Sequence, residues 1–88
     1  MKKTMLITGS SSGVGAATAK YFAEHGFNVV ATLRNPDAAH GLEGIANLEV
    51  VRLDVEDTAS IDNALKVAVE RFGRIDLVIN NAGYGQYG

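Results

Sequence analysis

The sequence contains no cysteine and a single proline in its 88 residues. Without cysteine the chain can form no disulfide, no thiolate zinc site and no cysteine nucleophile, so a metal would need His25, His40 and carboxylates as ligands. The two histidines are isolated in the sequence, and we expect them at the surface or at helix ends rather than in a metal site. The absence of cysteine is compatible with a reducing compartment, and we expect a cytoplasmic protein.

Clusters of basic residues and long apolar runs are also missing. Lys2 and Lys3 form the only adjacent basic pair, and the formal net charge is −2, so a phosphate-neutralising surface for nucleic acid is not expected. The apolar run that follows, from Met5 to Ile7, is too short for a signal peptide or a membrane span. The sequence therefore predicts a soluble chain with neither a nucleic-acid partner nor a membrane partner.

Short β-branched runs alternate with segments of helical periodicity along the whole chain. Apolar residues make up 47 % and charged residues 20 % of the sequence, which is typical of a globular protein. The alternation predicts an α/β fold in which a parallel sheet is buried on both faces. We expect strands at residues 4–8, 29–33, 48–53 and 75–79, and helices at residues 14–25, 36–43 and 58–72.

The apolar positions of the first and last helical segments predict the faces that they bury. The last helix is expected to begin at a cap formed by Asp57 or Thr58 and to end at Gly73. The predicted buried faces comprise Val14, Ala17, Thr18, Tyr21 and Phe22 in the first helix and Ile61, Ala64, Leu65, Ala68, Val69 and Phe72 in the last.

Each parallel pair needs a right-handed crossover, and the usual arrangement puts the first two crossovers on one face of the sheet and the third on the other. This arrangement predicts the order 3-2-1-4, which is half of a doubly wound, Rossmann-like, three-layer domain. This order places the first and fourth strands side by side. The loops that follow them, residues 9–15 and 80–83, then open together at the point where the strand order reverses. A ligand is expected in the crevice between these loops.

The loop after the first strand contains Gly9, Gly13 and Gly15, and this strand-loop-helix context is typical of a phosphate site. Glycine permits a sharp turn and the close approach of a pyrophosphate, while the N-terminus of the next helix faces the anion. Ser11 and Ser12 add hydroxyl donors. The alternative is a glycine triplet that serves only a tight turn, and the second polar loop, Asn80-Asn81-Ala82-Gly83, argues against it.

Three motifs together resemble the short-chain dehydrogenase/reductase family over essentially the whole chain. They are Thr8-Gly9-Ser10-Ser11-Ser12-Gly13-Val14-Gly15 after the first strand, Asp54-Val55 after the third and Asn80-Asn81-Ala82-Gly83 after the fourth. The resemblance implies a nicotinamide dinucleotide cofactor, carbonyl and alcohol redox chemistry, and an adenine site at Asp54, for which a turn or helix-cap role is the alternative. The implied cofactor contacts are Gly9, Ser11, Ser12, Gly13, Val14, Gly15, Asp54, Val55, Asn81, Ala82 and Gly83.

The residue at the end of the second strand is expected to select between NAD and NADP. An acid there binds a ribose 2′-hydroxyl, whereas an arginine pairs with a 2′-phosphate. The sequence has Arg34 and no acid at this position, so we predict NADP(H), with Ser11 or Ser12 as further donors to the phosphate. The alternative for Arg34 is a solvated charge beside Asp37. A methyltransferase-like nucleotide site would need an acid here and is disfavoured.

The catalytic residues that the resemblance would imply, a serine and a Tyr-x-x-x-Lys motif, are missing from these residues. Four positions after Tyr21 and Tyr84 the sequence has His25 and Gly88. Tyr84 and Tyr87 are expected to be exposed loop aromatics, because no lysine is near enough to lower a phenol pKa.

We therefore predict that residues 1–88 form a nucleotide-binding half-domain that is catalytically incomplete. The alternative is a non-catalytic folding or assembly module. In that reading the unpaired apolar edge at Val78 and Ile79 drives self-association.

Overall fold

The computed structural model describes residues 2–9, 13–35, 41–42, 44–54 and 56–80, and these form four strands and two helices. Every strand pair is parallel and the sheet order is β3-β2-β1-β4, which confirms the predicted α/β fold and strand order. In chain order the elements are β1 (Thr4–Thr8), α1 (Gly13–Glu24), β2 (Asn28–Leu33), β3 (Leu48–Arg52), α2 (Thr58–Phe72) and β4 (Leu77–Asn80).

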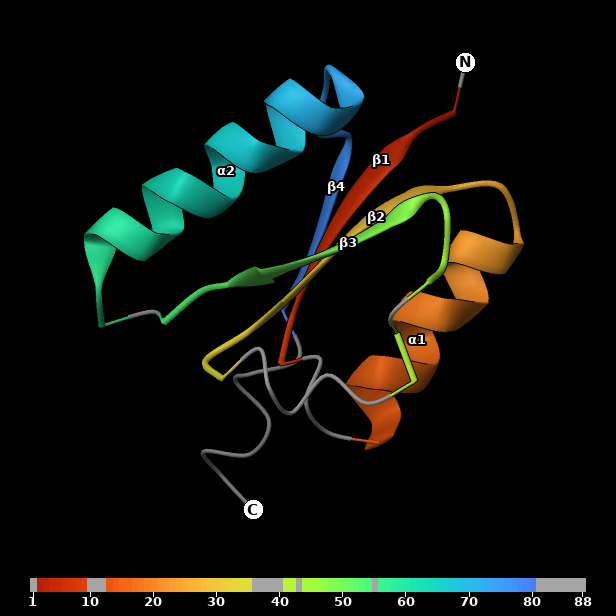
Figure 1. Ribbon diagram of the computed structural model, residues 1–88, viewed down its shortest axis with the longest axis horizontal. Coiled ribbons are helices and arrows are strands. Elements are labelled where there is room, and N and C mark those ends of the chain that lie inside the picture. The colour runs from red at the N-terminus through yellow and green to blue at the C-terminus, as the bar shows by residue number, and fades with distance from the viewer. Residues whose placement is uncertain (1, 10–12, 36–40, 43, 55, 81–88) are drawn as a thin grey trace.

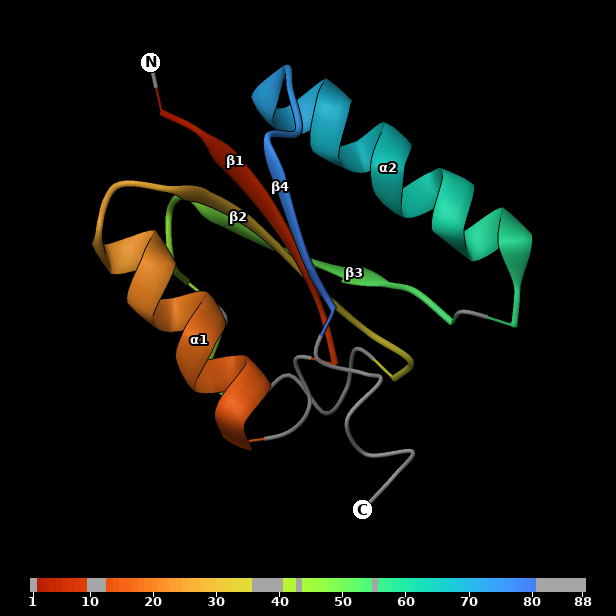
Figure 2. The same ribbon diagram turned by 180° about the vertical axis from the view of Figure 1, so that it is seen from behind.

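The sheet is the middle of three layers, with α1 on one face and α2 on the other (Figures 1 and 2). Side chains alternate between the two faces along each strand, so Met5 and Ile7 of β1 pack on the α1 side and Leu6 packs on the α2 side. Burial on both faces explains why β1 and β2 are nearly continuous apolar runs. Within the described residues, neither helix has the length and apolar character needed to cross a membrane.

The face of α1 that meets the sheet consists of small side chains. Ala19 and Ala23 are buried, whereas Ala17 and Tyr21 are exposed although the periodicity placed both on the buried face. That part of the prediction was wrong, because alanines four residues apart let the helix backbone approach the sheet more closely than an aromatic ring would allow. The Tyr21 ring instead stacks on exposed His25 with 4.1 Å between the ring centroids.

The ends of α2 are the ones that the sequence predicted. Asp57 is the N-cap, and its carboxylate accepts hydrogen bonds from backbone N–H groups of the first turn. Gly73 ends the helix in the left-handed region with φ of 84°. The predicted buried face was only partly correct, because Ala68 is fully buried while Leu65 and Val69 are 40 % and 51 % exposed.

The helix expected over residues 36–43 is not found among the described residues. Residues 36–40 and 43 lie outside the described part of the chain, and Gly41 and Leu42 lie in a turn. Gly41 has φ of 83°, a left-handed conformation that an α-helix cannot contain, so the predicted end of that helix was wrong. Leu42 is nevertheless 2 % exposed and packs into the core on the α1 side.

Asp76, the residue before β4, is hydrogen-bonded to the first residue of β1. Its carboxylate accepts the backbone N–H of Thr4 at 2.8 Å, and its own N–H donates to the Thr4 carbonyl at 2.8 Å. The carboxylate also pairs with Arg74 at 2.7 Å. These bonds hold the pKa of Asp76 below its usual value, first through the Thr4 N–H and then through Arg74.

Candidate functional site

The carboxyl ends of the four strands lie along one edge of the sheet, on the side where α1 begins (Figure 1). The parallel register pairs Thr8 with Asn80 and Leu33 with Arg52, so segments distant in sequence end next to one another. In open α/β sheets this edge carries the ligand, at the point where the strand order reverses. In this chain the reversal falls between β1 and β4.

The β1-to-α1 connection carries the predicted glycines. Gly9 has φ of 71°, a conformation that favours glycine and turns the chain sharply after β1. Gly13 is the first residue of α1, and Gly15 is buried within its first turn. Ser11 and Ser12 lie outside the described residues, and Val14 is described only by its helical backbone. The first turn of α1 contains no acidic residue, so its positive end is suited to an anion.

A hydrogen bond joins the ends of β1 and β4 at the reversal point. The Thr8 hydroxyl donates to the Asn80 side-chain oxygen at 2.8 Å, which fixes the start of the asparagine-containing loop. Neither residue was among the predicted cofactor contacts. The predicted strand order contained the signal for this bond, because it already placed the two residues on adjacent strand ends. Asn81, Ala82 and Gly83 lie outside the described residues.

Arg34 follows the last residue of β2 and is exposed. Within the described part of the chain it makes no ion pair; Asp37, the partner in the alternative interpretation, lies outside that part. Just before it, the Thr32 hydroxyl donates to the Ile7 carbonyl at 2.8 Å and ties β2 to β1. The backbone before Arg34 is therefore anchored, and Arg34 is exposed at the end of β2.

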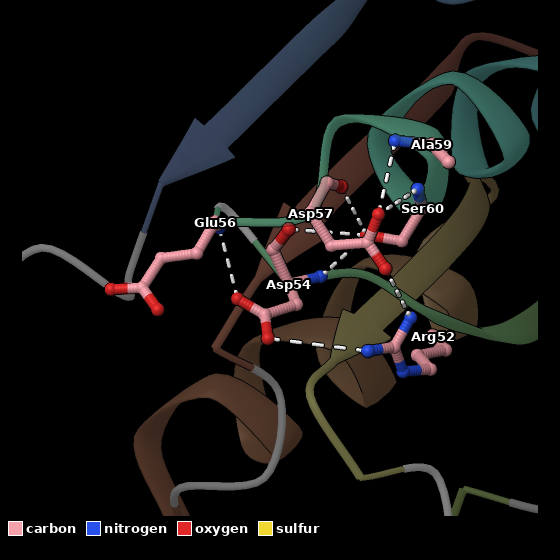
Figure 3. Close-up of polar contacts among 6 residues, drawn as sticks. All are labelled: Arg52, Asp54, Glu56, Asp57, Ala59 and Ser60. Atoms are coloured by element: carbon pink, nitrogen blue, oxygen red, sulfur yellow. Dashed lines mark hydrogen bonds and ion pairs between the residues drawn. The ribbon is translucent and has the colours of Figure 1, made fainter.

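Asp54 lies in a hydrogen-bonded turn between β3 and α2 (Figure 3). Its carboxylate accepts the Glu56 N–H at 2.9 Å, its carbonyl accepts the Asp57 N–H at 2.8 Å, and its own N–H donates to the Ser60 hydroxyl at 2.9 Å. Asp54 thus has the turn role of the alternative interpretation, and its half-buried carboxylate keeps further acceptor capacity. Val55 lies outside the described residues.

Arg52 supplies positive charge beside two carboxylates of this turn (Figure 3). Its guanidinium pairs with Asp57 at 3.2 Å and lies 4.0 Å from Asp54. The pKa of Asp57 is lowered, first by the hydrogen bond from Arg52 and next by the backbone N–H of Ser60. The sequence reasoning missed Arg52 and Ser60, because a strand-end arginine and a first-turn serine carry no distinctive spacing. No group of three metal-ligating side chains occurs among the described residues.

These layers, the strand order and the polar edge define a Rossmann-like α/β fold. A family model described as short chain dehydrogenase matches residues 3–88, and the chain belongs to that family. The chain is 48 % identical over 85 residues to an uncharacterized oxidoreductase of Schizosaccharomyces pombe, covering 97 % of this chain and 28 % of that protein. It is 44 % identical over 88 residues to the 2,5-dichloro-2,5-cyclohexadiene-1,4-diol dehydrogenase LinX of Sphingobium indicum, covering 92 % and 34 %.

Solved structures of the same fold agree with this assignment. The 3-ketoacyl-(acyl-carrier-protein) reductase of Brucella melitensis, solved with NADH, has a TM-score of 0.79 at 35 % identity over 86 % of this chain and 32 % of that one. The glucose dehydrogenase of Caenorhabditis elegans, solved in the apo form, has a TM-score of 0.79 at 36 % identity over 90 % and 37 %. The chain therefore spans about a third of the length of these relatives.

Proposed function

We propose that residues 1–88 form a nucleotide-binding half-domain that holds a nicotinamide dinucleotide, with NADP(H) preferred, as part of a carbonyl or alcohol oxidoreductase. The observation that carries the proposal is the shared carboxyl edge, where Gly9, Arg34 and Asp54 come after β1, β2 and β3 and Asn80 is the last residue of β4. Family membership and the similar reductase solved with NADH support a nicotinamide cofactor.

The chemistry of this edge fits the parts of such a cofactor. The sharp turn at Gly9 and the N-terminus of α1 suit the pyrophosphate, with Ser11, Ser12, Gly13, Val14 and Gly15 in the same connection. Asp54 and Val55 suit the adenine, and the segment Asn81-Ala82-Gly83 suits the remainder of the cofactor beyond the Thr8–Asn80 bond. The bound nicotinamide would supply the hydride transfer, while these residues bind and orient it.

Arg34 is proposed to distinguish NADP from NAD. A guanidinium forms paired, charge-assisted hydrogen bonds with a phosphate, and it gains nothing comparable from a ribose hydroxyl. Its exposure at the end of β2, without an ion pair to any described residue, leaves the guanidinium able to meet a 2′-phosphate.

Calorimetric titration with NADPH and, separately, NADH tests this proposal. We expect NADPH to bind more tightly, and Arg34→Ala to remove about tenfold or more of that preference, the loss expected for a hydrogen-bonded charge pair. The matched control is Arg74→Ala, which removes an arginine from the opposite edge of the sheet and should keep the preference. Equal affinity of the wild type for both cofactors would contradict the role of Arg34, and no binding of either would contradict the proposed function.

The chain of 88 residues is proposed to bind cofactor without turning over a substrate. Tyr21 is 54 % exposed on α1, and the residue four positions later is His25 rather than lysine. Tyr84 and Tyr87 lie outside the described residues. Carbonyl reduction needs a proton donor for the developing alkoxide, and these residues offer no tyrosine-lysine pair. Steady oxidation of NADPH by this chain when a carbonyl compound is added would contradict the proposal.

Self-association is the second candidate, and the exposed apolar side chains of β4 favour it. Leu77 and Val78 are 45 % and 61 % exposed, and among the described residues β4 pairs with β1 alone. Exposed strand edges of this kind recruit further strands. Light scattering after size exclusion should then show an oligomer that Val78→Lys converts to a monomer, and a wild-type monomer at high concentration would contradict it.

A further inference from the structure

Ser60 is a buried hydroxyl that joins the first turn of α2 to the end of β3 (Figure 3). It is 7 % exposed, and its oxygen accepts the Asp54 N–H at 2.9 Å. The same oxygen lies 3.1 Å from the Asp54 carbonyl and 2.8 Å from the Asp57 carbonyl, both of which can accept its proton. The hydroxyl therefore accepts the Asp54 N–H, while its single proton is shared between the Asp57 and Asp54 carbonyls.

The two contacts with Asp54 are separate from the capping of α2, whereas the contact with the Asp57 carbonyl lies within the cap. The cap is formed by the Asp57 carboxylate, which accepts the N–H groups of Ala59 and Ser60. The Ser60 hydroxyl lies between the turn that holds Asp54 and the Asp57 carbonyl (Figure 3). Its removal would leave the bonds to the Asp57 carboxylate in place but deprive the Asp54 N–H of its acceptor.

The position of the Asp54 carboxylate depends on this backbone. Asp54 is half-buried, and its carboxylate is bonded to the Glu56 N–H at 2.9 Å, with Arg52 at 4.0 Å. These groups constrain one side of the carboxylate and leave acceptor capacity for a ligand N–H. A group held in its binding geometry before the ligand arrives avoids the entropic cost of ordering it on binding.

We infer that Ser60 is the positioning residue for the adenine end of the cofactor. It fixes the Asp54 backbone so that the carboxylate accepts the exocyclic amino group of adenine. This inference rests on the proposed function, because it needs a bound adenine nucleotide. Ser60 itself touches no ligand, and its effect passes entirely through Asp54.

The test compares NADPH with its hypoxanthine analogue, in which a carbonyl replaces the adenine amino group. An acceptor at Asp54 favours the amino group and repels the carbonyl, so the wild type should bind NADPH about tenfold more tightly than the analogue. Ser60→Ala should reduce that ratio to about twofold, because a displaced carboxylate no longer distinguishes the two bases. Ala64→Gly, which weakens the same helix without touching Asp54, is the matched control and should keep the ratio.

If Ser60→Ala does not fold, a second pair of variants tests the same inference. Thr and Val have nearly the same shape, and only Thr keeps the hydroxyl, so Ser60→Thr should retain the ratio and Ser60→Val should lose it. Equal ratios for this pair, or an unchanged ratio in folded Ser60→Ala, would overturn the inference while the proposed function stands. A wild type that binds neither nucleotide would overturn the proposed function. Equal wild-type affinity for NADPH and its hypoxanthine analogue would overturn the assignment of Asp54 to the adenine, and with it the role of Ser60.

Discussion

Replacing Ala19 by leucine tests how closely α1 packs on the sheet. Ala19 has no exposed surface and lies in the core with Met5 and Val29. Leucine adds three carbons at a contact that already has the density of a protein interior, and overpacking of this kind costs about 1–3 kcal/mol. The same substitution at exposed Ala17 on the same helix should change the free energy of unfolding by less than about 0.5 kcal/mol.

Urea unfolding followed by helical circular dichroism measures both variants in parallel. For a domain of this size each kcal/mol corresponds to about 4–8 °C in melting temperature, so thermal unfolding gives an independent estimate. The m-value should stay constant, because neither substitution changes the surface exposed on unfolding by much. The wild-type protein is the reference for both.

The comparison decides between two buried faces of α1. The periodicity of apolar residues placed Ala17 on the buried face, and the structure places Ala19 there instead. Equal costs at the two positions, or a larger cost at Ala17, would refute the close approach through Ala19 and Ala23.

Three further outcomes follow from particular contacts. The pKa values of Asp57 and Asp76 are lowered in the folded protein, so their contribution to stability is present above about pH 4 and is lost as the pH falls below it. Asp76→Asn should therefore reduce the fall in the free energy of unfolding at acidic pH, measured by denaturant unfolding across pH. Gly73→Ala should lower the free energy of unfolding by about 1 kcal/mol, measured by denaturant unfolding. The φ angle is 84° there and no atom lies within 4 Å of an added Cβ, so the whole cost comes from backbone strain. Glu49→Gln, which removes the charge partner of exposed Arg71 and leaves the Arg71 contact with the Ala46 carbonyl, should cost less than about 1 kcal/mol by denaturant unfolding, and a larger loss would show that the pair is not screened as its exposure implies.

The strand order was predictable because it follows from few rules. Four apolar runs, right-handed crossovers and the turn residues at Gly9 and Gly73 were sufficient to give the order and most element ends. The buried faces of the helices were less predictable. Periodicity weighs a residue by its hydrophobicity, whereas packing against a sheet also favours small side chains, so the prediction placed Tyr21 on the buried face of α1 and missed Ala19.

The candidate site was also predictable only in part. The positions of Gly9, Arg34 and Asp54 at strand ends followed from the order of the sheet. The hydrogen bonds that organise the edge were not predicted: the strand order implied only that Thr8 and Asn80 lie on adjacent strand ends, and nothing in the sequence marked the bond between Asp54 and Ser60. A serine or threonine of this kind has no spacing that marks it in the sequence.

The most direct test of the account is to map NADPH binding on the backbone amides by nuclear magnetic resonance. Shift changes are expected to concentrate at the carboxyl edge of the sheet, at Gly9, Gly13 to Gly15, Arg34, Asp54 to Val55 and Asn81 to Gly83. Thr4 and Asp76, at the opposite edge, should not shift. Changes centred on that opposite edge, or the absence of any change with saturating NADPH, would contradict the claim that this edge is the cofactor site.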